Sequence, residues 1–444
     1  MATRGQRRRC DDLSQGYWEW VFADRRSKVL IGNQRYLSRL SEEARRNVGE
    51  MQRHFGRVNG PWKFERMISY GYFGCVVLVS RTESLLRPPR RLVLKRALTN
   101  RGEDELRNEI IQYTATRGSE HIVSMIGARD DPPAPLPHEI APTPRVSRLR
   151  KLALALRDIF NPSSPPRRIL RYDDPRRIDS DMQLSKLAGW PVVILEYLEN
   201  GTLGRLIDRM IFYNAYLPNR LLFSIFLCLA RSCVALAHPI RGQIGAANRL
   251  ETIPDDGEEP GDLFHGSLHV GNVMFGNPGG FKEHDLIPPV KLIDIGSAEE
   301  SRDLGGGVRR NLEEISILMM ALITKQKQPP VDKVSTYRNQ ATRATEILPT
   351  GRGINYPMLD NRLRDFLARC LATDPRARPG LRRVLAFTEA ESKRGPGTFE
   401  FHQRENETDE AIKEFLQRLI YDADTQIQDI NRNRYEHADP RLQR

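Results

Sequence analysis

The 444-residue sequence predicts an α+β fold from two kinds of hydrophobic pattern. Short apolar runs typical of buried strands lie at residues 68–76, 92–95 and 192–195. Residues 106–113 show helical spacing instead, with apolar side chains three or four positions apart, and residues 311–323 form a long apolar segment. The strand-like runs precede this long segment, which indicates a sheet followed by a helical part.

The first apolar run carries two closely spaced glycines. Residues 68–76 read Ile-Ser-Tyr-Gly-Tyr-Phe-Gly-Cys-Val, with Gly71 and Gly74 in the sequence. Glycine lets a backbone approach phosphate oxygens and adopt positive φ. The segment is interpreted either as a phosphate-binding loop or as an ordinary apolar hairpin.

Two later segments contain the polar residues expected of a site that holds nucleotide and metal. Residues 265–272 read His-Gly-Ser-Leu-His-Val-Gly-Asn, and residues 290–296 read Val-Lys-Leu-Ile-Asp-Ile-Gly. With the glycine segment and the lysine that ends the 92–95 run, they resemble, in the correct order, the motifs of protein kinases. Residues 366–379 closely resemble the H-to-I helix region of that family. This last resemblance argues against the small-molecule kinases.

The resemblance spans residues 64–386 and is to divergent kinase-like proteins of the kind found in filamentous fungi. It implies a two-lobed fold with a small β-rich N-lobe and a larger helical C-lobe. The expected boundaries are an N-terminal extension at 1–60, the N-lobe at 61–198 with a Pro-rich insert at 130–190, the C-lobe at 199–390 and a helical tail at 391–444.

The resemblance also implies ATP and Mg²⁺ as cofactors. The residues expected to contact nucleotide are Gly71, Gly74, Val76, Lys95, Glu109, Glu196 and Leu198. Backbone groups of Glu196 and Leu198 would bond the adenine edge, and Leu195 would be the gatekeeper. The expected metal ligands are Asn272 and Asp294.

Lys95 would contact the α- and β-phosphates and pair with Glu109 on the helix at 106–113. Asp104 and Glu105 are alternative partners. Both members of the pair are also interpretable as ordinary surface charges.

The catalytic loop departs from the kinase pattern at Ser267, which occupies the position of the aspartate that accepts the substrate proton. His269 is interpreted as a phosphate donor, as a displaced base or as a loop histidine bonded to backbone. Gly266 replaces the arginine that receives an activation-loop phosphate in many kinases.

The interval between Asp294 and Asn311 is about half the usual length for a protein kinase and lacks an Ala-Pro-Glu motif. Residues 301–308 are expected to form a flexible loop, which leaves a peptide little to bind on. Arg378, whose usual glutamate partner is missing, is expected to have a structural role such as capping a neighbouring helix.

These observations favour a pseudokinase that binds ATP and Mg²⁺, transfers phosphate poorly or not at all, and presents a conformation to an unknown protein partner. The alternative is an active serine/threonine or small-molecule kinase with an atypical catalytic loop. A scaffold that has lost nucleotide binding is the third hypothesis.

Composition places the protein in the cytoplasm, with the nucleus as the alternative. Five cysteines without a Cys-x-x-Cys pair indicate a reducing compartment, and neither a signal peptide nor a membrane span is expected. The net charge is +12, but the basic residues are dispersed and no nucleic-acid motif accompanies them. Nucleic-acid binding is therefore not expected.

Three helices are expected outside the kinase-like core. One starts near residues 41–46, and a basic amphipathic one lies at 146–159 within an insert whose proline content indicates mobility. The third, at 408–420, has apolar positions that would dock on the C-lobe, or alternatively bind a partner.

Overall fold

The computed structural model describes residues 42–58, 60–70, 74–82, 90–98, 100–130, 175–187, 191–243, 246–351 and 353–421. The predictions for Gly71 and for the helix at 146–159 fall outside these residues. The fold is α+β.

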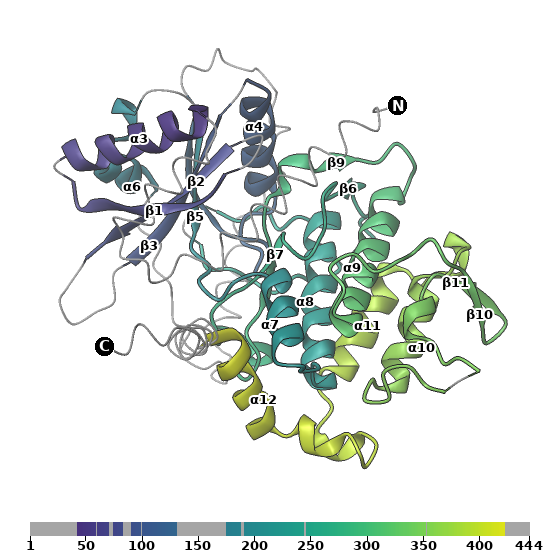
Figure 1. Ribbon diagram of the computed structural model, residues 1–444. Coiled ribbons are helices and arrows are strands. Elements are labelled where there is room, and N and C mark those ends of the chain that lie inside the picture. Colours follow the sequence, from purple (N-terminus) through teal and green to yellow (C-terminus); the bar gives the residue numbers. More distant parts are fainter. Residues whose placement is uncertain are drawn as a thin grey trace, which may run out of the picture.

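The sheet is antiparallel and has the strand order β1-β2-β3-β5-β4 (Figure 1). Its strands are β1 (Trp62–Tyr70), β2 (Gly74–Arg81), β3 (Arg90–Ala97), β4 (Met125–Arg129) and β5 (Val192–Glu196). The expected run at 92–95 lies in β3 and the run at 192–195 in β5, while the glycine segment joins β1 to β2. β-branched and apolar residues in these runs suit a pleated, buried surface.

Alternate side chains of the sheet belong to two hydrophobic clusters. Val77 and Val79 lie in the cluster that contains helices α3 (Glu42–Arg57) and α6 (Pro175–Met182). Leu78 lies in the larger cluster, which continues into the helices of the C-terminal half. The helix expected to start near residues 41–46 is therefore α3, and it covers one face of the sheet (Figure 1).

Helix α4 (Asn100–Ala115) stands beside the sheet and includes the predicted helical segment 106–113. Leu106 and Tyr113 are almost fully buried in the larger cluster, as their spacing predicted.

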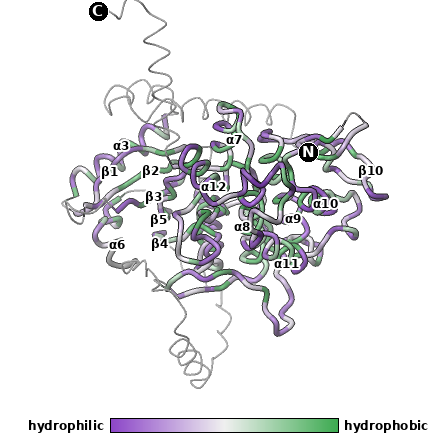
Figure 2. Tube along the Cα trace, turned by 90° about the horizontal axis from the view of Figure 1, so that it is seen from below, coloured by the Kyte–Doolittle hydropathy of each residue, from purple (hydrophilic) through white to green (hydrophobic). Residues whose placement is uncertain are grey.

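The C-terminal half packs around α8, and its hydrophobic residues gather there (Figure 2). Its main helices are α7 (Leu203–Phe212), α8 (Asn219–Ala237), α9 (Gly306–Thr324), α10 (Asn361–Cys370), α11 (Leu381–Glu391) and α12 (Asp409–Leu416). Among the described residues, α8 alone has the length and hydropathy to cross a membrane, but 94% of its apolar window is buried in the protein. Such burial is typical of a core helix.

Short strand pairs complete the architecture. They are β6 (Leu263–Phe264) with β9 (Glu299–Glu300), β7 (Val273–Phe275) with β8 (Val290–Leu292), and β10 (Ser335–Tyr337) with β11 (Gln340–Thr342).

The prediction of a flexible loop at 301–308 was wrong for its last residues, because α9 begins at Gly306. The glycines there permit close packing. A Cβ atom on Gly307 would lie 2.0 Å from the carbonyl oxygen of Asp262, so the first turn of α9 rests directly on the neighbouring backbone.

Arg378 has a structural role, as expected, but its partners differ from the expected helix cap. Its guanidinium pairs with Glu313 of α9 and donates to the carbonyl of Ala372 at 2.8 Å. An acid on α9 thus takes the place of the missing partner.

The helix expected at 408–420 is confirmed as α12 and a following π-helical turn (Gln417–Tyr421). Thr408 caps it by accepting a bond from the backbone of Ala411 at 3.2 Å. Ile412 and Leu416 are buried in the larger cluster, so this segment docks on the helical half.

Candidate functional site

Lys95 lies near the end of β3, opposite Val76 on β2 and Val193 on β5. Its Nζ atom is 2.6 Å from Oε2 of Glu109 on α4 and 2.5 Å from Oδ1 of Asp294. The structure therefore places Glu109 beside Lys95, rather than the alternatives Asp104 and Glu105. One ammonium group joins residues from three distant segments.

The charges in this cluster hold one another in place. Burial disfavours the charged form of Lys95, but the carboxylates of Asp294 and Glu109 outweigh it and raise the lysine pKa. The Lys95 ammonium in turn lowers the pKa of Asp294. The Asp294 side chain is 52% exposed, whereas that of Glu109 is 1% exposed. Glu109 is thus an internal anchor, and Asp294 is the ionised group accessible to a ligand.

The β7–β8 hairpin brings the two expected metal ligands to the same end of a strand pair. Val273 pairs with Leu292, and the backbone N–H of Ile293 donates to the carbonyl of Asn272 at 3.0 Å. Asn272 and Asp294 flank this paired end.

Asp294 adopts a left-handed conformation with φ 61° and ψ 54°. Aspartate tolerates this region better than most residues. Its backbone N–H donates to the hydroxyl of Tyr113 at 3.0 Å, so α4 supports the unusual geometry.

A second contact from α4 holds the segment that follows Asp294. The side-chain amide of Asn108 donates to the carbonyls of Gly296 at 2.8 Å and Ala298 at 2.9 Å. Because Asn108 precedes Glu109, the positions of both members of the carboxylate pair depend on one helix.

The loop at 265–272 is bonded internally and to the Asp294 segment. The amide nitrogen of Asn272 donates to the carbonyl of Ser267 at 2.9 Å, which leaves the amide oxygen as an acceptor. His265 accepts from the backbone of Ser267 at Nδ1 and donates from Nε2 to the carbonyl of Ile293 at 3.1 Å. Both histidine nitrogens are therefore used.

Gly266 has φ +78°, and a Cβ atom there would lie 2.1 Å from the carbonyl oxygen of Ser297. The arginine of many kinases has no room at this position. Close contact between the two loops thus explains the glycine.

Ser267 is half-buried and presents a hydroxyl at the predicted position of the base. His269 is exposed, and its Nδ1 accepts from the backbone N–H of Gly271 at 3.0 Å. In the neutral ring this bond leaves the proton on Nε2, which is then a donor. The geometry matches the backbone-bonded interpretation and disfavours a displaced base.

The residues expected to bond the adenine edge make more contacts within the protein than expected. The backbone N–H of Glu196 donates to the carbonyl of Ser124 at 3.0 Å. Its carboxylate accepts from the backbone of Ser124 at 2.7 Å and from Lys291 at 2.9 Å. Leu195 and Leu198 are buried in the larger cluster. The side chain of Glu196 therefore has a structural role that its sequence position did not reveal.

Gly74 opens β2, and a Cβ atom there would lie 2.7 Å from the carbonyl oxygen of Arg96. One small hollow is lined by Gly74, Lys95, Glu109 and Asp294, together with neighbouring residues of α4. Four residues selected from the sequence thus converge on one place.

Some supporting residues were missed by the sequence analysis. Asn311 is fully buried, accepts from the backbone of His265 at 3.1 Å and donates to the carbonyl of Leu263 at 2.9 Å. Asn108 and Tyr113 likewise support Asp294. A polar residue on the apolar face of a helix could have indicated these roles, because a buried polar group needs a hydrogen-bond partner.

No protein-family model matches this chain, and no curated protein matches it.

Proposed function

We propose that this chain is a protein-kinase-like protein with two lobes that binds ATP with Mg²⁺ and is impaired in phosphoryl transfer. The observation that carries the proposal is the convergence of Lys95, Glu109 and Asp294 from β3, α4 and the turn after β8. A lysine held by a helix glutamate, next to a metal-binding aspartate, is the arrangement on which kinases depend.

The donor set fits Mg²⁺. Asn272 offers an amide oxygen and Asp294 an exposed carboxylate, and hard oxygen ligands of this kind suit the ion. Bound Mg·ATP would supply the transferable phosphoryl group and the charge that neutralises it. Lys95 would contact phosphate oxygens, while Glu109 keeps the ammonium in position. His269 would donate from Nε2 to an anionic oxygen.

Ser267 carries the functional defect. At neutral pH a serine hydroxyl cannot take up the proton of the substrate hydroxyl, as the carboxylate of an aspartate does. A positioned general base contributes about 10²–10⁴ in rate, or roughly 3–5 kcal/mol of barrier. Slow transfer is compatible with this loss, because positioning and metal electrostatics supply most of the catalysis.

The segment after Asp294 is short and offers a peptide substrate little to bind to, which favours a function other than peptide phosphorylation. It contains a short 3₁₀ turn (Ile295–Ser297) and β9, which pairs with β6, before α9 begins at Gly306. We therefore favour a conformational signal to a protein partner. The four described cysteines are unpaired and buried, in keeping with the cytoplasm or nucleus as the setting.

An active kinase with atypical chemistry is the second candidate, favoured by the intact contact between Lys95 and Glu109. The deciding experiment measures γ-phosphate transfer from Mg·ATP to the protein itself and to generic acceptors. We expect a silent wild type and a gain of transfer in Ser267→Asp. Wild-type transfer that disappears in Asp294→Asn and does not increase in Ser267→Asp would replace the pseudokinase proposal with the active enzyme.

A further inference from the structure

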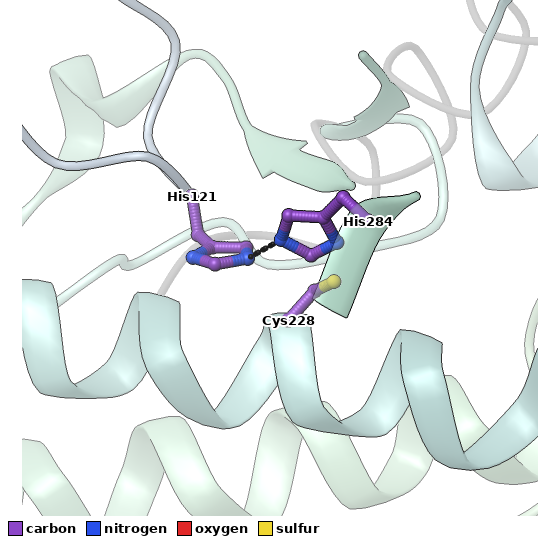
Figure 3. Close-up of side chains that lie close together, drawn as sticks. All are labelled: His121, Cys228 and His284. Carbon is purple, nitrogen blue, oxygen red and sulfur yellow. Dashed lines mark hydrogen bonds between the residues drawn. The ribbon is translucent and has the colours of Figure 1, made fainter. Parts of the chain in front are cut away.

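Three buried side chains that have no part in the nucleotide site meet beside α8. His121 precedes β4, Cys228 lies on α8 and His284 ends a short 3₁₀ turn (Lys282–His284), as Figure 3 shows. One nitrogen or sulfur atom from each residue lies within 4.8 Å of the others. Each residue is at most 1% exposed.

The separations suit a tetrahedral transition-metal ion. Nε2 of His121 is 3.1 Å from Nε2 of His284. Zinc bonds of about 2.0–2.1 Å to nitrogen and about 2.3 Å to sulfur imply ligand separations of roughly 3.3 Å between nitrogens and roughly 3.6 Å between nitrogen and sulfur. The two histidine nitrogens already lie close to the required separation, and the sulfur atom lies within 4.8 Å of both.

A carboxylate contacts the ring nitrogen of His121 that does not face His284. Glu251 is fully buried, and its Oε2 is 2.6 Å from Nδ1 of His121 while its Oε1 accepts from the His121 backbone at 2.8 Å. Histidines that bind metals usually donate their other ring N–H to such an acceptor, which orients the ring and increases its basicity. The bond directs the lone pair of Nε2 toward His284.

Two acidic groups beside the histidines offer negative charge to a bound cation. A Cys228 thiolate and the Glu251 carboxylate together balance the two positive charges of a divalent ion inside the core. Without an ion, one Nε2 atom donates a hydrogen bond to the other across 3.1 Å, and Cys228 lies beside them.

We propose that Nε2 of His121, Nε2 of His284 and Sγ of Cys228 bind a structural Zn²⁺ ion. Mixed nitrogen and sulfur ligands select zinc over Mg²⁺ or Ca²⁺. Glu283 lies nearby, with Oε1 3.5 Å from Nε2 of His284, but both of its oxygens accept from Arg231 at 2.8 Å, so the three side chains alone define the site. The proposal does not depend on nucleotide binding.

The ion would fasten three segments together close to the nucleotide site. The carbonyl of His121 accepts from the backbone of Leu292 at 2.9 Å, and Leu292 ends β8 two residues before Asp294. A metal at His121 would therefore stabilise the β8 segment that leads to Asp294.

The test uses the full chain, stripped with a chelator and titrated with Zn²⁺ in the presence of a weak competing chelator. We expect about one zinc per chain and a rise in the midpoint of thermal unfolding on reloading, because the ion binds the folded state. Co²⁺ in place of zinc should give the near-ultraviolet charge-transfer absorption of a thiolate ligand. Failure of the wild type to bind zinc, or a cobalt complex without that absorption, overturns the proposal.

Cys233 provides the matched control, since it is a second buried, unpaired cysteine on α8. Cys228→Ser should lose the thiolate absorption, and Cys233→Ser should keep it. Glu251→Gln should bind zinc about 10–100-fold more weakly, as for other supporting residues of metal ligands. If Cys228→Ser does not fold, the wild-type cobalt spectrum and the reversible stripping still decide the question. Equal zinc binding by Cys228→Ser and the wild type contradicts the site.

Discussion

Replacement of Gly266 by alanine tests the packing of the loop at 265–272 against the Asp294 segment. The new Cβ would lie 2.1 Å from the carbonyl oxygen of Ser297, where real contacts are essentially never below 3.0 Å. One of the two loops must therefore move by roughly 1 Å. The substitution also forces an L-residue to keep φ +78°, which costs about 1 kcal/mol.

Movement of the loop would weaken the bond from His265 to the carbonyl of Ile293, for which the net contribution is about 1 kcal/mol. Together with the conformational cost and residual overlap, we expect Gly266→Ala to lower the free energy of unfolding by about 2–4 kcal/mol.

Chemical denaturation of three variants separates these contributions. Gly279 also has positive φ, at +91°, but has nothing within 4 Å of the added Cβ, so Gly279→Ala should cost only about 1 kcal/mol. Gly49 lies in α3 with nothing within 4 Å of its Cβ position, and Gly49→Ala should stabilise the protein by about 0.5–1 kcal/mol. If Gly266→Ala is no more destabilising than Gly279→Ala, the proposed close contact is refuted.

Two further predictions concern the charged cluster. Glu109→Gln should lower the free energy of unfolding by about 1–3 kcal/mol, because it removes a buried partner of Lys95 while Asp294 remains. The control Glu103→Gln removes an exposed pair with Arg107 on the same helix and should cost at most about 0.5 kcal/mol. Equal losses in the two variants would contradict the importance of burial. Lys95 lowers the pKa of Asp294, so the stabilisation is complete above the unfolded-state pKa of about 3.9 and is lost as the pH falls through the lower folded-state value. The stability difference between wild type and Asp294→Asn, measured by denaturation, should therefore be smaller at pH 3 than at pH 6, and a constant difference would speak against the ion pair.

The parts of the structure that sequence predicted well have local patterns. The strands at 92–95 and 192–195 are short apolar runs, and the helical spacing predicted the burial of Leu106 and Tyr113. Glu109 was expected beside Lys95 from the kinase resemblance. The helix at the C-terminal end carried a capping threonine and a periodic apolar face. Such patterns extend over a few residues and can be recognised without knowledge of the tertiary structure.

The remainder depends on partners far apart in the chain. The contacts of Asn108 with Gly296 and of Arg378 with Glu313 span large sequence separations, and neither leaves a local pattern. Helix α6, in the predicted Pro-rich insert, buries Ile178 and Met182 against α3 and the sheet. This packing was not predicted, because the proline content of the insert indicated mobility.

Glycine was the residue type most easily misinterpreted. Gly307 was assigned to a loop on conformational grounds, and Gly266 was interpreted as a lost arginine. In both positions the structure shows a backbone too close for a side chain. Conformational freedom and steric room are different reasons for glycine, and sequence alone does not separate them.

Calorimetric titration with Mg·ATP tests the central proposal most directly. We predict binding by the wild type and by Asp255→Asn, a control at an almost fully exposed acid, with affinity at least about tenfold weaker in Asp294→Asn, equivalent to about 1.4 kcal/mol. Absence of binding by the folded wild type, or equal affinity in Asp294→Asn, would contradict a nucleotide site built on Lys95 and Asp294.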